Sequence, residues 1–207
     1  MTSKKLLPLS GIVFVVSILV TVIGIGGSTP DTDASAEKFF SYYDASNGRQ
    51  VLAAFLIAAA VPFLVFFGVS LAAGGRSFWE LVVIVGTGLA ATGFLLTALI
   101  HFALADAPGS HAAPESVKTL GILDGDFWVA VNAALGVLML GAAGTMLERR
   151  MRWLGWPALV IGVALVIPFA DFFALLLTGI WIMVTSVVLS REATESAPVM
   201  REAVAAA

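Results

Sequence analysis

A long apolar stretch near the C-terminus constrains the fold more than any other feature of the chain. Between Trp153 and Ser190 the only charged side chain is Asp171. This stretch is the last of several apolar blocks, and a water-soluble domain of 207 residues cannot bury them all. Charged residues make up only 12% of the chain, against roughly 25% in soluble proteins. We therefore expect an all-α, polytopic transmembrane helix bundle that forms a single domain.

The apolar blocks divide into six predicted spans. The last block would form a helix of ~57 Å, nearly twice the thickness of the hydrocarbon core, so we break it at Pro168. The fifth span is then only ~22 Å long and needs a locally thinned bilayer or Trp153 and Trp156 as interface anchors. The predicted spans are residues 6–25, 51–73, 80–105, 127–147, 153–167 and 171–190, and residues 191–207 are predicted to form a flexible cytoplasmic tail.

The first apolar block has two interpretations. Ala34-Ser35-Ala36 resembles the small-residue cleavage site of a secretory signal peptide. However, the apolar run from Leu6 to Ile25 exceeds the roughly 7 to 15 residues of a signal core, and the candidate cleavage site lies well beyond its end. We expect this segment to be retained as the first span.

Loop charges predict the orientation of the chain. Six spans place both termini on one side, and the positive-inside rule assigns the more basic side to the cytoplasm. The other side keeps only Lys38, Arg49 and Lys118 of the 11 basic residues. We therefore expect a multi-pass protein of the plasma membrane with both termini in the cytoplasm. The basic residues assigned to the cytoplasmic side are Lys4, Lys5, Arg76, Arg149, Arg150, Arg152, Arg191 and Arg201.

Two polar segments, residues 28–50 and 106–126, are predicted to be loops on the outer side. Within the first, residues 36–43 favour a short interfacial helix that presents its aromatic rings to the lipid headgroups. In the second, Asp124-Gly125-Asp126 is typical of an acidic helix start. The aromatic residues of the predicted interfacial helix are Phe39, Phe40, Tyr42 and Tyr43.

Three local patterns predict details of the spans. Pro62 lies at the middle of the second span and should kink it, because proline removes a backbone hydrogen bond. Ser77 and Glu80 match a capping box at the start of the third span. The small residues of the third span predict close packing against a neighbouring helix. They are Gly86, Gly88, Ala90 and Gly93.

Polar residues at membrane depth provide the candidate site, because a central charge costs ~2.5 to 3.5 kcal/mol on insertion scales. His101, Asn132 and Asp171 all fall near the outer leaflet in the predicted topology. One interpretation is a polar ligand-binding pocket in which His101 pairs with Asp171 and Asn132 bridges helices. In the other, Asp171 caps the sixth span, His101 reaches the interface and Asn132 bonds a neighbouring backbone.

Several functions are excluded or disfavoured by missing residues. The chain has no cysteine, which excludes disulfides, thiolate metal sites and dithiol chemistry. No basic stripe supports nucleic-acid binding, and every lysine lies outside the predicted spans, which excludes a retinal Schiff base. Haem is disfavoured, because His111 lies in a proline-bounded loop and gives His101 no second axial histidine. We predict no catalytic residue, no metal ligand and no cofactor.

The chain resembles a broad group of six-helix bacterial membrane proteins of unknown function, common in actinobacteria. Three features carry the resemblance: Phe39-Phe40-Ser41-Tyr42-Tyr43 followed by Asn47-Gly48-Arg49, a basic linker into Trp153-Leu154-Gly155-Trp156, and a closing pair of spans hinged at Pro168. The resemblance implies a bacterial inner membrane and six spans, and it implies no activity.

These observations favour a non-enzymatic membrane protein. We expect it to bind a partner or a small apolar ligand through its outer loops and the space between its helices. A small transporter or channel-like protein is the alternative, and a membrane enzyme or haem carrier is a third hypothesis. The expected partners are the lipid bilayer and a membrane protein or a second copy of the chain.

Overall fold

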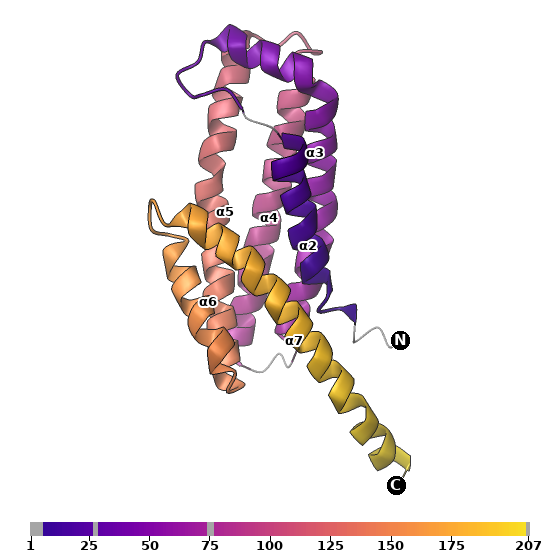
Figure 1. Ribbon diagram of the computed structural model, residues 1–207. Coiled ribbons are helices and arrows are strands. Elements are labelled where there is room, and N and C mark those ends of the chain that lie inside the picture. Colours follow the sequence, from indigo (N-terminus) through magenta and orange to yellow (C-terminus); the bar gives the residue numbers. More distant parts are fainter. Residues whose placement is uncertain (1–5, 27–28, 74–76, 206–207) are drawn as a thin grey trace.

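The computed structural model describes the backbone of residues 6–26, 29–73 and 77–205. These residues form helices and no strands, as the sequence predicted. The helices run up and down in a bundle, and the last one extends beyond its lower end (Figure 1). In chain order the elements are α2 (Ser10–Leu19), the π-helix η1 (Val20–Gly26), α3 (Ala36–Leu71), α4 (Phe78–Asp106), α5 (Pro114–Glu148), α6 (Arg152–Ala164) and α7 (Asp171–Ala205).

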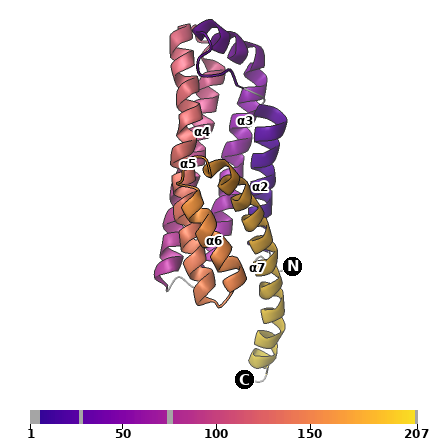
Figure 2. The same ribbon diagram turned by 60° about the vertical axis from the view of Figure 1, so that its left-hand side comes forward.

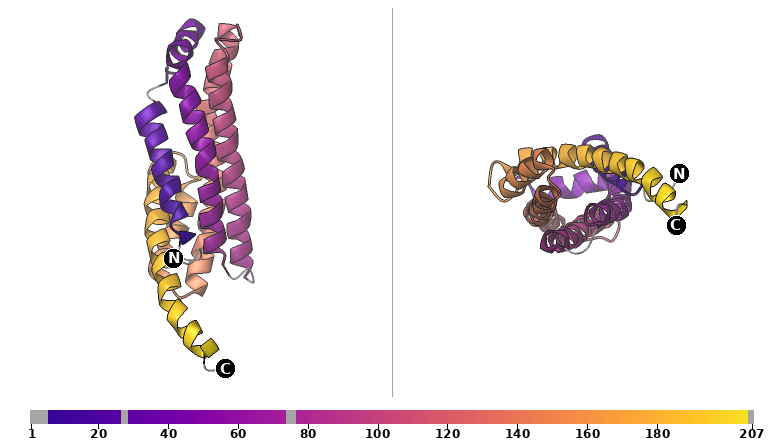
Figure 3. Two further views of the ribbon diagram at one scale, coloured as in Figure 1. Left: turned by 90° about the vertical axis from the view of Figure 1, so that its right-hand side faces the viewer. Right: turned by 90° about the horizontal axis from the view of Figure 1, so that it is seen from below.

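Four helices in the described part of the chain are long and apolar enough to cross a membrane, namely α3, α4, α5 and α7. Ser10–Ile25 forms a shorter apolar helix, and α6 has 13 residues. We call the end of the bundle that holds the α2–α3 and α4–α5 connections the outer end, and the opposite end the inner end. The α5–α6 turn lies at the inner end, and the C-terminus lies beyond it (Figures 1 and 3).

Close packing of α4 against α5 forms the centre of the bundle. A Cβ atom on Gly86 would meet the backbone of Leu138, and one on Gly141 would meet the backbone of Val83. The two helices approach this closely because glycine has no side chain at the contact. Gly88, in contrast, has open space around its Cβ position, so the predicted packing role applies to Gly86 and not to Gly88.

Two helices start earlier than the predicted spans. Ser35 accepts a hydrogen bond from the Lys38 backbone amide (3.3 Å) and starts α3. Residues 36–43 are helical as predicted, and residues 44–50, predicted as a loop, continue the same helix. Pro114 stands in the first turn of α5, where its missing N–H leaves no bond unmade, so the predicted start at Asp124 was wrong. Both helices therefore extend beyond the predicted spans at the outer end. Pro62 lies inside α3 without interrupting it.

A small second core lies at the outer end. The first turns of α3 lie across the end of the bundle before the helix turns down into it (Figure 1). Phe39 and Tyr43 are buried there with Leu104 and Val117, although we predicted that all four aromatic rings of this segment would face lipid headgroups. They face inwards because the extended helix α5 supplies a surface to pack on, and the Phe39 ring lies against Gly121, where a Cβ atom would meet it.

Helices α6 and α7 form a hairpin that is shorter than the rest of the bundle. The chain turns at Pro168, as predicted, and α7 begins at Asp171. The turn lies about halfway up α5, not at the outer end (Figure 2). Phe169 at its tip has a positive φ of 73° and is 96% exposed. At the other end, α7 continues as a helix to Ala205, within the segment predicted as a tail.

Candidate functional site

A buried carboxylate at the outer end has an incomplete set of hydrogen bonds. Asp124 of α5 is only 7% exposed, and its Oδ2 lies 3.4 Å from Nε2 of His101 on α4. Nδ1 of His101 lies 3.2 Å from Oε1 of Gln50 on α3, and Gln50 donates its amide to the Tyr42 hydroxyl (3.2 Å). The Asp124 Oδ1 atom is buried and has no hydrogen-bond partner among the described residues.

The proton positions in this chain of contacts follow from the chemistry of its members. An amide oxygen only accepts, so Nδ1 of His101 must donate to Gln50. In a neutral ring Nε2 then carries no hydrogen, and a hydrogen bond across the 3.4 Å between Nε2 and the Asp124 Oδ2 would require one proton, held either by the ring or by the carboxyl group. The pair is uncharged overall whichever of the two atoms holds this proton. Asp124 Oδ1 remains an acceptor in both cases.

Asp124 lines a pocket of about 320 Å³ between helices. One wall comes from α2 and η1, and the other walls come from α3, α4 and α5. This volume lies at the lower end of the range for small-molecule sites, about 300 to 1,000 Å³. The apolar lining includes Ile18, Val22, Ile57, Phe94 and Trp128, and the polar lining includes Thr97, His101 and Asp124.

The α6–α7 hairpin contributes no residue to the lining of this pocket. Helix α7 packs on α2 and touches α5, whereas η1 packs on α3. The side chains of Asp171, at the start of α7, and Asn132 of α5 are hydrogen-bonded. The start of α7 therefore lies at the height of Asn132 along α5. Trp128 and Asp124 lie ~6 and ~12 Å further toward the outer end of α5. The pocket therefore lies beyond the end of α7, between η1 and α5.

The structure brings together only part of the predicted polar cluster. The Asn132 amide donates to Asp171 Oδ2 (3.3 Å), which gives the expected link between helices. His101 pairs with Asp124 and not with Asp171. Asp171 also accepts from the Phe172 backbone amide (2.9 Å), which stabilises the start of α7. Of the three predicted residues only His101 lines the pocket, and ligand binding by all three stays a prediction.

Sequence reasoning missed Asp124 and Gln50 as candidate site residues. Both were assigned to loops because their segments are polar, and Asp124 was explained as a helix start. Pro114 followed by Glu115 was the available signal for an earlier start, since both are favoured in the first turn of a helix. A start at Pro114 places Asp124 ten residues into the helix, where the role of a helix start no longer accounts for it.

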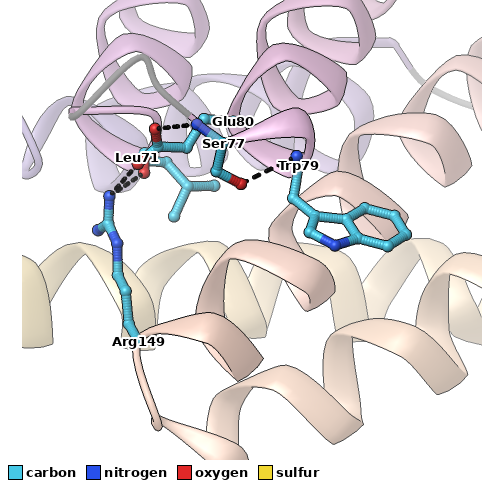
Figure 4. Close-up of polar contacts among 5 residues, drawn as sticks. All are labelled: Leu71, Ser77, Trp79, Glu80 and Arg149. Carbon is cyan, nitrogen blue, oxygen red and sulfur yellow. Dashed lines mark hydrogen bonds and ion pairs between the residues drawn. The ribbon is translucent and has the colours of Figure 1, made fainter.

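A second buried carboxylate lies at the inner end, and its contacts are complete. Glu80 forms the predicted capping box with Ser77 and accepts a hydrogen bond from Arg149 (3.1 Å). The same Arg149 nitrogen donates to the Leu71 carbonyl oxygen at the end of α3 (3.0 Å; Figure 4). One guanidinium thus links α3, α4 and α5. These contacts account for Glu80 as a structural residue.

The protein is helical, four of its described helices are long and apolar enough to cross a membrane, and a small pocket lies between helices near one end. No family model, curated protein or solved structure matches the chain. Within the described residues, no group of three or more His, Asp or Glu side chains is placed to hold a metal ion.

Proposed function

We propose that this chain is a non-enzymatic integral membrane protein that binds a small, mainly apolar ligand in the outer pocket. The proposed topology has six spans, with both termini in the cytoplasm of a bacterial inner membrane. The observation that carries the proposal is the buried, unpartnered Oδ1 of Asp124 at a pocket with mostly apolar walls. Such a pocket with few polar groups is typical of ligand sites.

Helix lengths support this placement in the bilayer. Helix α5 rises ~24 Å between Glu148 at its inner end and Asn132. If the hydrocarbon core begins near Glu148 and is ~30 Å thick, the α6–α7 turn stops ~6 Å below the outer boundary, so these two helices complete the six spans only where the bilayer is locally thinned, as predicted for the fifth span. The exposed rings of Phe169, Phe172 and Phe173 then lie in lipid. The pocket lies at the outer boundary, where a ligand dissolved in the outer leaflet can reach it from the side.

The ligand site can be tested by filling the pocket. Gly125 lines the pocket, and its Cβ position has nothing within 4 Å, so Gly125→Leu adds volume without a backbone clash. Gly88→Leu is the matched control, because Gly88 is equally open and lies outside the pocket. In native mass spectrometry from mild detergent, we expect the unmodified protein and Gly88→Leu to retain a small molecule that Gly125→Leu loses. Equal retention by all three, or by none, contradicts the proposal.

The topology can be tested by labelling, because the chain contains no cysteine. Single cysteines are introduced at Ser110 in the α4–α5 connection, at Arg152 and at Arg191. A membrane-impermeant maleimide added to intact cells should label Ser110→Cys and leave Arg152→Cys and Arg191→Cys unlabelled until the cells are opened. Labelling of Arg191→Cys in intact cells would contradict a cytoplasmic C-terminus.

A further inference from the structure

We propose that the outer pocket binds an amphipathic primary or secondary ammonium ion, and that binding releases the proton shared by His101 and Asp124. This inference rests on the proposed function and adds the chemical class of the ligand. The site would then take up one organic cation for each proton that it releases.

The hydrogen-bond inventory favours a donor on the ligand. Asp124 Oδ1 is an acceptor that the described residues leave without a donor. The hydroxyl of Thr97 cannot supply one, because it donates to the Gly93 carbonyl oxygen of its own helix (3.1 Å). An N–H group at this position would satisfy the carboxylate, and an ionised donor forms roughly twice as strong a bond as a neutral one.

The charge balance links the ammonium ion to the proton. Before binding, the His101–Asp124 pair holds one shared proton and has no net charge. An ammonium ion added to this pair would leave an uncompensated positive charge in a buried site, which is unfavourable. If the shared proton leaves for bulk water, the pair becomes −1 and the ammonium ion neutralises it. The ammonium keeps its own protons, and one N–H donates to Oδ1 while a second can replace the departed proton at Nε2.

The apolar lining fits the remainder of such a ligand. Phe94 and Trp128 pack edge to face with their ring centroids 6.3 Å apart, and both line the pocket. An aromatic face near a buried carboxylate favours a cation through the ring quadrupole. Ile18 and Val22 on the opposite wall provide apolar contact. An ammonium group carried on a short apolar body therefore matches both parts of the site.

Two tyrosines lie near the His101–Asp124 pair. Tyr43 of α3 is close enough to Asp124 for an electrostatic interaction, and its neighbour Tyr42 bonds Gln50. Helices α2 and η1 contribute no titratable side chain to the described lining. Tyrosine hydroxyls stay protonated near neutral pH, so they supply no proton there.

The test compares 2-phenylethylamine with the uncharged 2-phenylethanol by isothermal titration calorimetry on the full chain in detergent. Repeating each titration in two buffers of different ionisation enthalpy counts the protons released. Alkyl ammonium groups remain protonated between pH 6 and 8, so any proton released comes from the protein. We expect about one proton released per amine bound, with affinity rising up to tenfold per pH unit. For 2-phenylethanol we expect weaker, pH-independent binding without proton release.

Variants separate this inference from the proposed function. Asp124→Asn should weaken amine binding at least tenfold and abolish proton release while retaining alcohol binding. Asp126→Asn is the matched control, since Asp126 is an exposed carboxylate on the same helix outside the pocket, and it should behave like the unmodified protein. Amine binding without proton release, or amine and alcohol binding equally well, overturns the inference and leaves the ligand site standing. If neither probe binds more tightly to the unmodified protein than to Gly125→Leu, both the inference and the proposed site are contradicted.

Discussion

Glu80 and Asp124 are two carboxylates with the same burial and different surroundings. Each residue is 7% exposed, Glu80 at the inner end and Asp124 at the outer end. Glu80 bonds the Ser77 amide and the guanidinium of Arg149, which also holds the end of α3. Asp124 has one contact to His101, an unpartnered oxygen and a pocket beside it.

This difference separates a structural carboxylate from a candidate binding group. A buried charge is tolerated where a partner and further hydrogen bonds compensate for its desolvation, as they do around Glu80. Around Asp124 the compensation is incomplete, and each unmade bond of this kind costs about 1 to 3 kcal/mol. A bound ligand would supply the missing contact. The following predictions test the contrast, beginning with the largest effect.

Removing the guanidinium of Arg149 at the inner end should cause the largest loss of unfolding free energy. Arg149→Met leaves Glu80 charged without its partner and the Leu71 carbonyl oxygen without its donor. Breaking a buried pair costs 3 to 5 kcal/mol, and the 28% exposure of the Arg149 side chain reduces this to about 2 to 3 kcal/mol. Denaturant titration in mixed micelles measures the loss. The exposed Arg152→Met should change stability by less than about 0.5 kcal/mol, and equal losses would remove the structural role of Arg149.

Changing each carboxylate to its amide compares the two sites directly. Glu80→Gln removes the charge that Arg149 binds and should cost about 2 kcal/mol of unfolding free energy. Asp124→Asn should cost less than about 1 kcal/mol, because its amide can donate to Nε2 of a neutral His101 and no other protein bond is lost. The same denaturant titration provides both values. A larger loss for Asp124→Asn than for Glu80→Gln would reverse the assignment of roles.

Replacing Arg150 in the α5–α6 turn with glycine should raise the free energy of unfolding modestly. Arg150 has a φ of 62°, and its amide donates to Leu147 while that of Met151 donates to Met146, a Schellman motif. Glycine adopts this conformation without steric cost, so Arg150→Gly should gain about 1 kcal/mol in the same assay. The variant should bind 2-phenylethylamine with unchanged affinity. A loss of stability would show that the Arg150 side chain contributes to this turn.

The smallest change in unfolding free energy is expected for a substitution of Asp171. Asp171→Asn weakens the favourable charge at the start of α7 and should cost about 0.5 kcal/mol. Because Asp171 lies outside the pocket, amine affinity should change less than about twofold in the calorimetric titration. A tenfold loss of affinity would instead support the predicted ligand-binding role of Asn132 and Asp171.

The sequence predicts the helical class, the membrane character and the break at Pro168, because each depends on local composition or a single residue type. The capping box of Ser77 and Glu80 was predicted for the same reason, since both partners lie within one turn. The starts of α3 and α5 were placed too late. Polar composition favours loops at both places, whereas Ser35 and Pro114 start helices that extend beyond the predicted spans.

The partners of the site residues depend on how separate helices are aligned. Pairing His101 with Asp171 assumed that the α6–α7 turn reaches the outer end, but the hairpin stops at the level of Asn132. The early start of α5 instead brings Asp124 beside His101. Arg149 and Glu80 lie 69 positions apart in the sequence. They meet at the inner end because of how their separate helices are aligned. No local pattern in the sequence encodes contacts of this kind.

A structure of the protein with 2-phenylethylamine tests the central claim most directly. We expect ligand density between η1 and α5, with the amine nitrogen within hydrogen-bond distance of Asp124 Oδ1 and the phenyl ring beside Trp128. The contacts of Glu80 and Arg149 should be unchanged. A pocket that holds only ordered water at a saturating amine concentration, or amine bound elsewhere on the protein, would contradict the assignment of Asp124 as the binding group.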